Sequence, residues 1–413
     1  MPDSANNADY NKREELLSRT IALEETGVVP FLTMYGYYPA RAYGFTCEEI
    51  MTDYDKTMEA YVNVTLDLRP TAHDNPFPTR FFAKLMEATD FQPMKWPGHG
   101  VSVMSGIQFV ESEFMKADEY PELFADPSGF MLRRFWPRIF GACEGFAKLP
   151  QPFSVYGHQA FSEMASFADE EVIKGFEALA EAGRHARIMV KGAEEYNRRL
   201  KELGYPPQFG GVTQAPFDAL SDYFRGIKGS MLDMYRRPDE VLEAVELLLP
   251  HMIKRGLTAN KRGVPRVFIP LHKGLDSFMS PKQFERFYWP SLKKLILALV
   301  DEGITPFCFW EGDSTTRLEA MADVPPGKVV HWFERTDIKK AKEVLSGIAC
   351  VRGGVPISLL ISAKPDDVTK YCRNLIKTVG KGGGFILDTS TVLDDARSEN
   401  VIAMAKSVHE FGL

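Results

Sequence analysis

The sequence lacks the cysteine pairs and long apolar runs that mark several classes of protein. Its five cysteines are odd in number and far apart, and no two of them form a CxxC pair. This spacing predicts neither a disulfide framework nor a zinc ribbon. No run reaches the roughly 18 apolar residues of a membrane span, and the polar first residues do not resemble a signal peptide. We therefore expect a cytoplasmic protein without a membrane partner.

A strong excess of one charge is also missing. The net charge is −7 over 413 residues, and lysine and arginine are scattered along the chain. Because a nucleic-acid-binding protein needs basic residues grouped along the phosphate backbone, we expect no nucleic-acid partner. What the chain does contain is 45% hydrophobic and 25% charged residues, which predicts a folded protein with a sizeable core.

Short apolar runs alternate with amphipathic stretches, which is typical of a parallel sheet covered by helices. Eight runs are predicted as strands: 28–35, 62–68, 208–213, 266–271, 304–310, 328–333, 348–351 and 384–387. Eight βα units close most economically as a barrel. We therefore predict an α/β fold, a (β/α)8 TIM barrel, in one domain over residues 1–413.

The gap between the second and third runs, about residues 70–206, is too long for a loop without structure of its own. We interpret it as an insertion between strands 2 and 3 that covers the barrel mouth and excludes water from the chemistry. An open doubly wound sheet is the competing architecture, but no GxGxxG turn follows the first run.

Residues at the carboxyl ends of the strands face the ligand in a TIM barrel. The predicted ends carry many aromatic, polar and charged side chains. The candidate substrate-binding residues are Tyr35, Tyr37, Asp67, Arg69, Thr213, Asp222, Tyr223, Trp310, Arg352 and Asp388. The two arginines are suited to holding a carboxylate or phosphate, and pairing with an internal acid is the alternative for each.

The segment FCFWEGD, residues 307–313, carries the strongest candidate. Carboxylates at the end of a buried aromatic run are costly unless they meet a cation, a metal or a substrate proton. We therefore predict Glu311 and Asp313 as catalytic residues, with capping of the next helix as the alternative. His272 is predicted as a general acid or base or a metal ligand, with a structural, hydrogen-bonded role as its alternative.

Several motifs follow one another from the third predicted strand onward. They are FGGVTQAPF (209–217), MYRRP (234–238), SPKQF (280–284), YWP (288–290), GGVP (353–356) and FIL (385–387). In this order and spacing the chain resembles the uroporphyrinogen decarboxylase superfamily. That superfamily includes the decarboxylase and methyltransferases that pass methyl groups to or from corrinoids.

Two departures from the superfamily narrow the expected function. The decarboxylases hold substrate carboxylates with an RQAGRY segment after the first strand, whereas this chain has MYGYYP at 34–39 and lacks both arginines. The methyltransferases that activate a thiol with zinc carry His-x-Cys after strand five and a cysteine after strand eight. Here Phe309, Glu311 and either Ser390 or Thr391 stand at those positions.

What remains resembles the substrate-side enzymes of anaerobic demethylation. The resemblance implies a methyltransferase that moves a methyl group from a small methyl ether or methylated amine to cobalamin on a separate corrinoid carrier protein. Protonation or Lewis-acid coordination improves the leaving group in such a reaction. Glu311 would be the acid or a metal ligand, with His272 and His331 as co-ligands of a zinc ion; a core histidine is the alternative for His331.

Two other functions stay open at this point. A decarboxylase or lyase would act on a small carboxylic acid held by Arg69 or Arg352, and a non-catalytic protein would bind a tetrapyrrole or corrinoid at the barrel mouth. A homodimer is compatible with the sequence.

Overall fold

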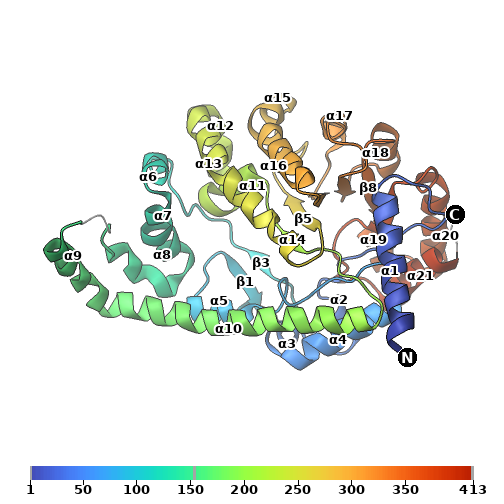
Figure 1. The fold of residues 1–413 in the computed structure, drawn as a ribbon, viewed down its shortest axis with the longest axis horizontal. Coiled ribbons are helices and arrows are strands. Elements are labelled where there is room, and N and C mark those ends of the chain that lie inside the picture. Colours follow the sequence, from blue (N-terminus) through green and yellow to red (C-terminus); the bar gives the residue numbers. More distant parts are fainter. Residues whose placement is uncertain (1, 152–154, 411–413) are drawn as a thin grey trace.

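The structure, a computed structural model, describes residues 2–151 and 155–410. Its centre is a six-stranded parallel sheet in the order β4-β5-β6-β7-β8-β9 (Figure 1). The strands are β4 (Gly211–Val212), β5 (Arg266–Leu271), β6 (Thr305–Trp310), β7 (Val330–Phe333), β8 (Cys350–Val355) and β9 (Phe385–Thr389). Each pairs with the next one in the sequence, so the predicted α/β class with a parallel sheet is confirmed.

Two short extended segments continue the sheet at its edges. Phe31 forms a parallel bridge with Leu387 of β9, and His73 forms one with Pro207 just before β4. The Thr71 N–H donates to the Phe31 carbonyl at 2.8 Å, which joins the two segments to each other. The hydrogen-bonded circuit that results is consistent with a TIM barrel.

Residues 62–68, predicted as the second strand, are helical instead. They end α4 (Tyr54–Leu68), whose first turn is capped by the Asp53 side chain. Met58, Tyr61, Thr65 and Leu68 are buried at spacings of three and four residues, which is the period of a helix. The chain becomes extended only after this helix, at residues 71–73.

The remaining helices before residue 74 and after residue 206 lie around the sheet. They are α1 (Pro2–Ile21), α2 (Tyr38–Ala42), α3 (Cys47–Thr52), α11 (Pro216–Ala219), η4 (Leu220–Arg225), α12 (Gly226–Arg236), α13 (Pro238–Gly256), α14 (Thr258–Lys261), α15 (Pro281–Gln283), η5 (Phe284–Tyr288), α16 (Trp289–Asp301), η6 (Thr315–Arg317), α17 (Leu318–Met321), α18 (Ile338–Val344), α19 (Ile357–Ser362), α20 (Pro365–Val379) and α21 (Ser398–Glu410). The core lies between them and the strands. On α16, for example, Leu292, Leu295, Ile296 and Leu299 bury one face of the helix.

The two faces of the strands are buried against different partners. On one face, aromatic side chains pack together: Phe309 stacks on Trp332 with ring centroids 3.9 Å apart, and Phe268 lies 6.1 Å from each. On the other face, Trp310 packs against Phe284 and Tyr288 of η5. Successive residues of a strand therefore point alternately into the aromatic cluster and into the helical layer.

The segment between His73 and Pro207 has its own small sheet and helices. Its elements are α5 (Ala83–Thr89), β1 (Met94–Pro97), β2 (Gly100–Val101), β3 (Gln108–Phe109), α6 (Tyr120–Ala125), α7 (Pro127–Phe130), η1 (Met131–Phe135), α8 (Trp136–Ile139), η2 (Gly141–Lys148), α9 (Gly157–Glu163), η3 (Met164–Ala168) and α10 (Glu170–Glu202). Figure 1 shows α10 running along the molecule from the sheet to α9, which lies at the end opposite to both chain termini. No helix among the described residues has the length and apolarity to cross a membrane.

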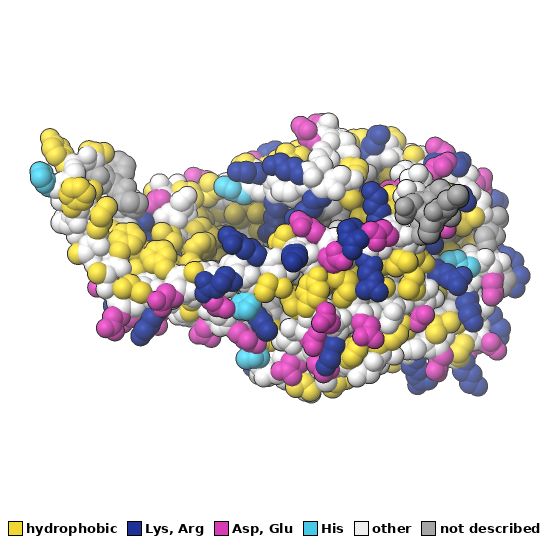
Figure 2. Space-filling view, turned by 60° about the horizontal axis from the view of Figure 1, so that its bottom comes forward, with side chains coloured by type: hydrophobic (Ala, Val, Ile, Leu, Met, Phe, Trp, Pro, Cys, Tyr) yellow, Lys and Arg dark blue, Asp and Glu magenta, His cyan; other side chains and the backbone are white. Residues whose placement is uncertain are grey.

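The end of the molecule formed by residues 155–176, which we call the arm, is apolar on its surface. Val155, Tyr156, Phe161, Met164 and Phe167 are all exposed there. Figure 2 shows hydrophobic side chains gathered at this end of the molecule and a hollow with further hydrophobic side chains between the arm and the sheet region.

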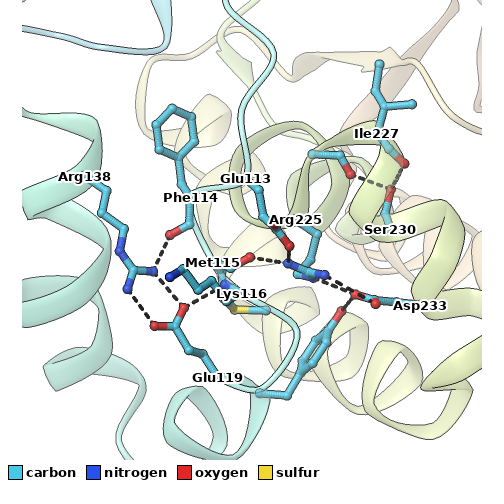
Figure 3. A network of polar contacts seen from close by, with 12 residues as sticks. Glu113, Phe114, Met115, Lys116, Glu119, Arg138, Arg225, Ile227, Ser230 and Asp233 are labelled. Carbon is cyan, nitrogen blue, oxygen red and sulfur yellow. Dashed lines mark hydrogen bonds and ion pairs between the residues drawn. The ribbon is translucent and has the colours of Figure 1, made fainter.

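Two arginines fasten residues 113–119 to the helices on either side (Figure 3). Arg138 of α8 forms a two-pronged ion pair with Glu119 at 2.6 and 2.7 Å and donates to the Phe114 carbonyl. Arg225 of η4 donates to Asp233 of α12 at 2.5 Å and also contacts Glu113 and the Met115 carbonyl. Arg225 and Asp233 are almost fully buried, so each depends on the other for charge compensation.

We expect Asp233→Asn to destabilise the protein by about 3–5 kcal/mol, because the variant leaves a buried guanidinium with only part of its counter-charge. Urea denaturation measures the change. Glu122→Gln, which breaks the exposed pair with Arg134, is the matched control and should cost at most about 1 kcal/mol. Equal effects of the two substitutions would contradict a fastening role for Arg225 and Asp233.

Candidate active site

A cluster of charged side chains lies at the carboxyl ends of β5, β6 and β7. His272 follows β5, and Glu311 and Glu334 follow β6 and β7. The His272 Nε2 lies 3.3 Å from Glu311 Oε1, and its Nδ1 lies 2.5 Å from Asp222 Oδ2. Both ring nitrogens therefore face a carboxylate, an arrangement that favours the doubly protonated imidazolium.

Two aspartates reach this cluster from the helical turns that follow β4. Asp222, in the π-helical turn η4, also pairs with the Lys273 Nζ at 2.7 Å. Asp218, at the end of α11, is 1% exposed and accepts hydrogen bonds from the backbone N–H groups of His272 and Lys273, each at 3.0 Å. The Tyr288 hydroxyl donates to Asp218 at 2.7 Å. Asp218 thus holds the backbone on which His272 is mounted.

Two glycines allow this close packing. A Cβ at Gly274 would lie 2.4 Å from the ring of Tyr288, so a larger residue would displace the tyrosine from Asp218. Gly312 has a φ of +149°, a conformation that other residues rarely adopt, and a Cβ there would lie 2.6 Å from Leu275. The turn after Glu311 is therefore restricted to glycine.

The charges of the cluster shift one another's protonation. Burial opposes the charge on His272, but hydrogen bonds with Asp222 and Glu311 overcome it and raise the pKa of His272 to about 11. Burial likewise opposes the charge on Asp222, and its contacts with His272 and Lys273 still lower the pKa of Asp222 below its ordinary value. Burial raises the pKa of Asp218 to about 6 and raises that of Glu334. At neutral pH His272 is therefore a cation, positioned between Asp222 and Glu311, that can donate a proton.

Of the residues predicted from the sequence, the structure brings together Glu311, His272 and Asp222. Tyr223 lies beside them in the chain, and its hydroxyl accepts a hydrogen bond from Gln214 at 3.1 Å. Asp313 is exposed, and its carboxylate accepts from the N–H and hydroxyl of Thr315. Because Thr315 begins η6, this contact corresponds to the helix-capping role that was the alternative for Asp313.

Three predicted residues point into the helical layer instead of the cluster. Trp310 is fully buried, and its Nε1 donates to the Nδ1 of His331 at 3.1 Å. Burial lowers the pKa of His331 to about 4, so this histidine is a neutral core residue. Thr213 is also fully buried and donates its hydroxyl to the Met252 carbonyl. The strand register turns all three away from the ligand side.

The four candidates from the first two predicted strands are also elsewhere. Tyr35 is fully buried and its hydroxyl meets Thr65 of α4 at 3.0 Å, while Tyr37 is buried against Met51 of α3. Asp67 bonds the Tyr43 hydroxyl at 2.5 Å. Arg69 ends α4 and precedes the extended residues 71–73, so it lies at the amino-terminal side of the sheet. The helix that replaces the second predicted strand is the reason for the positions of Asp67 and Arg69.

Arg352 and Asp388 form an internal ion pair. The Arg352 Nε donates to Asp388 at 2.7 Å, and both side chains are 0% exposed. Arg352 also donates to Gln208 at 2.8 Å, and its guanidinium lies 4.0 Å from the centre of the Trp332 ring. The alternative of an arginine paired with an internal acid therefore applies, and neither residue has surface left for a substrate.

The site also contains groups absent from the predicted set: Asp218, Lys273, Tyr288 and Glu334. Lys273 and Glu334 stand next to strand ends and share the signal that identified His272 and Glu311. Asp218 and Tyr288 lie inside apolar helical stretches, where a single polar residue looks like part of a helix surface. Only the fold reveals that the two meet.

No group of three or more His, Cys, Asp and Glu side chains within residues 2–151 and 155–410 is arranged to hold a metal ion. The three predicted zinc ligands do not meet, because His331 faces the helical layer.

Comparison with known proteins places this arrangement in a family. The family model described as Uroporphyrinogen decarboxylase (URO-D) matches residues 175–411, more than half of the chain. This chain belongs to the uroporphyrinogen decarboxylase family. All the residues of the cluster lie within the matched range. The sequence resemblance is therefore confirmed at the level of the family, and no curated protein matches the chain.

Two solved structures were compared with this family member. A methyltransferase from Methanosarcina mazei superposes with a TM-score of 0.61 at 15% identity, covering 96% of this chain and 97% of that one. A B12-independent methionine synthase from Shewanella sp. W3-18-1, in complex with selenomethionine, gives a TM-score of 0.33 at 9% identity, over 48% and 59% of the two chains. The first likeness extends the shared fold over nearly the whole chain.

We expect Asp222→Asn to lower the pKa of His272, since loss of a contacting opposite charge typically lowers such a pKa by about 1–3 units. A histidine is protonated below its pKa, so the wild-type ring stays charged through pH 9 and the variant loses its proton at lower pH. Nitrogen-15 NMR of the ring across pH 6–11 measures this. Asp366→Asn, on the exposed first turn of α20, is the control. An unchanged titration in Asp222→Asn would contradict the assigned coupling.

Proposed function

We propose that this protein is a methyltransferase that moves a methyl group from a small methyl ether or methylated amine to cobalamin carried by a separate corrinoid protein in the cytoplasm. Family membership and the full-length likeness to a protein named as a methyltransferase support the reaction class. The observation that carries the proposal is His272, a cation held between Asp222 and Glu311 at the carboxyl ends of the strands.

The proposal includes the complete barrel. We infer that the extended residues around Phe31 and His73 are the first two strands and that the circuit of hydrogen bonds closes an eight-stranded barrel. Residues 74–206 are then the insertion between strands 2 and 3. In such a barrel the carboxyl ends of the strands are the ligand side, which is where the His272 cluster lies.

Demethylation needs a proton at the leaving heteroatom. The reduced corrinoid supplies the electron pair that takes the methyl group, and the pair of the broken carbon–oxygen or carbon–nitrogen bond stays on the donor. Without protonation that donor atom would leave as a high-energy anion. His272 Nε2 carries a proton toward Glu311, the more exposed of its two carboxylate partners, and this is the proton the donor atom receives.

The other residues of the cluster position this proton. Asp222 holds Nδ1 and thereby fixes the orientation of the ring, in the manner of a carboxylate behind a catalytic histidine. Lys273 neutralises the second oxygen of Asp222. Glu311 accepts a hydrogen bond from Nε2–H at rest, so we assign it the role of guiding His272 toward the donor and of returning a proton from solvent afterwards.

A zinc ion has no part in this mechanism. The resemblance implied Glu311, His272 and His331 as its ligands, but His331 accepts a hydrogen bond from Trp310 in the helical layer and does not reach the other two. This donor set does not fit the ion, and we derive no step through it.

The decarboxylase alternative relied on Arg69 or Arg352 to hold a carboxylate. Arg352 is fully buried and paired with Asp388, and Arg69 lies at the amino-terminal side of the sheet. Neither supports that reaction, so we do not retain it as a second proposal.

The test is an anaerobic visible spectrum of the protein with cob(I)alamin and a panel of methoxyarenes and methylated amines, with a corrinoid carrier protein supplied and with zinc either present or absent. We expect donor-dependent formation of methylcobalamin. His272→Gln should reduce the rate by about 100-fold or more, the usual range for loss of a general acid. Glu311→Gln should reduce the rate by a smaller factor. As the pH rises, the variant should also lose activity at a lower pH than the wild type, because loss of the Glu311 charge lowers the pKa of His272.

Glu319→Gln, an exposed glutamate on α17, is the matched control and should keep the wild-type rate. Absence of methylcobalamin with every donor would overturn the methyltransferase proposal. Carbon dioxide release from a small acid would then identify a decarboxylase. Tight cobalamin binding without turnover, unaffected by Glu311→Gln, would identify a binding protein.

A further inference from the structure

A cavity of about 480 Å³ lies between the inserted segment and α13. None of its lining residues belongs to the His272 cluster. Its walls are mostly apolar: Leu123, Met131, Phe135 and Ile139 come from the inserted segment, and Leu247 and Leu248 come from α13. This volume is within the range of about 300–1,000 Å³ that small-molecule sites occupy.

The polar groups of the cavity are few and lie together. His251 and Arg255 are four residues apart on α13, so they share one face of that helix. Gln214 and Tyr223, joined by a hydrogen bond of 3.1 Å, line the same cavity. No aspartate or glutamate is among the described residues that line it.

Arg255 is solvent-exposed at the rim of the cavity. Within residues 2–151 and 155–410 its guanidinium takes part in no ion pair or hydrogen bond. Its positive charge nevertheless reaches the Tyr223 hydroxyl, where it opposes the burial that raises the pKa of that tyrosine. The cavity therefore combines an apolar body with one uncompensated cation at its edge, which is complementary to an apolar molecule that ends in an anion.

We propose that this cavity binds an apolar carboxylate, with the aromatic or aliphatic body between η1 and α13 and the carboxylate on Arg255. A carboxylate matches the planar guanidinium by a two-pronged hydrogen bond. His251 lies one helical turn away and is placed to donate to the same group. The site goes beyond methyl transfer and does not depend on it.

The cavity also adjoins the catalytic cluster through one turn of helix. Tyr223 lines the cavity, and the preceding residue, Asp222, holds His272. These two neighbours in the π-helical turn η4 have different surroundings: Asp222 contacts His272, and Tyr223 lines the cavity. A ligand packed against Tyr223 therefore contacts the turn that carries Asp222.

The test uses isothermal titration calorimetry of the full chain, without donor or corrinoid, with 1-naphthoate and with 1-naphthalenemethanol. The two probes share the ring system and differ in charge. We expect saturable binding of 1-naphthoate and at least tenfold weaker binding of the neutral alcohol. Arg255→Gln should weaken 1-naphthoate at least tenfold and leave the alcohol unchanged.

Lys254→Gln is the matched control, because it removes a neighbouring exposed cation that does not line the cavity, and it should bind as wild type does. Met131→Trp fills the cavity and should abolish binding of both probes, with circular dichroism verifying the fold. Absence of 1-naphthoate binding to the wild type, equal binding of the two probes, or an Arg255→Gln variant with unchanged affinity would overturn the proposal. Since no turnover is measured, these outcomes are independent of the methyltransferase assay.

Discussion

The candidate site depends on one buried carboxylate, Asp218. It accepts two backbone hydrogen bonds from His272 and Lys273 and a third from the Tyr288 hydroxyl, and so it joins α11, the turn after β5 and η5. A buried carboxylate without these donors would be strongly disfavoured. With a pKa of about 6, Asp218 is mostly ionised at neutral pH, and its negative charge helps His272 to keep a proton. One residue thus fixes the backbone geometry of the cluster and adds to the effect of Asp222 and Glu311 on the charge of His272.

Two π-helical turns deliver side chains to this cluster. η5 ends at Tyr288, the residue that reaches Asp218, and η4 carries Asp222 toward His272 and Tyr223 toward the apolar cavity. A π-helical turn holds one more residue than an α-helical turn, so it rotates the side chains that follow and places neighbours on different surfaces. Such turns are frequent at functional sites, and here they explain how a short stretch after β4 supplies both a proton-positioning group and a cavity wall.

The central part of the fold was predictable from apolar runs, and the amino-terminal part was not. Residues 266–271 form β5 at the predicted bounds, because a strand buried on both faces has a continuous apolar sequence. Residues 62–68 have the same appearance, yet they form the end of α4. Val62 and Val64 suggest a strand, and only the burial of Met58, Tyr61 and Leu68 at helical spacing separates the two.

The direction of side chains was the harder prediction. Cys308 is expected from strand alternation to face the helical layer, and Trp310, two residues further, must then face the same way. Trp310 and the paired His331 are accordingly core residues, which removes one ligand from the predicted metal set. Glu311 and His272 were identifiable because they follow the ends of strands β6 and β5, where strand alternation no longer fixes the direction of the side chain.

The charges of the cluster restrict which part of a substrate can approach it. Four carboxylates, those of Asp218, Asp222, Glu311 and Glu334, surround the two cations His272 and Lys273. An anionic group brought to this edge would be repelled by the carboxylates and would compete with them for His272. A neutral methyl ether or a neutral amine meets no such penalty. A molecule that carries both a methyl group and a carboxylate must therefore keep its carboxylate away from the cluster. Within the described chain, Arg255 takes part in no ion pair, and it lies at the rim of the apolar cavity whose wall includes Tyr223, the residue next to Asp222 in η4.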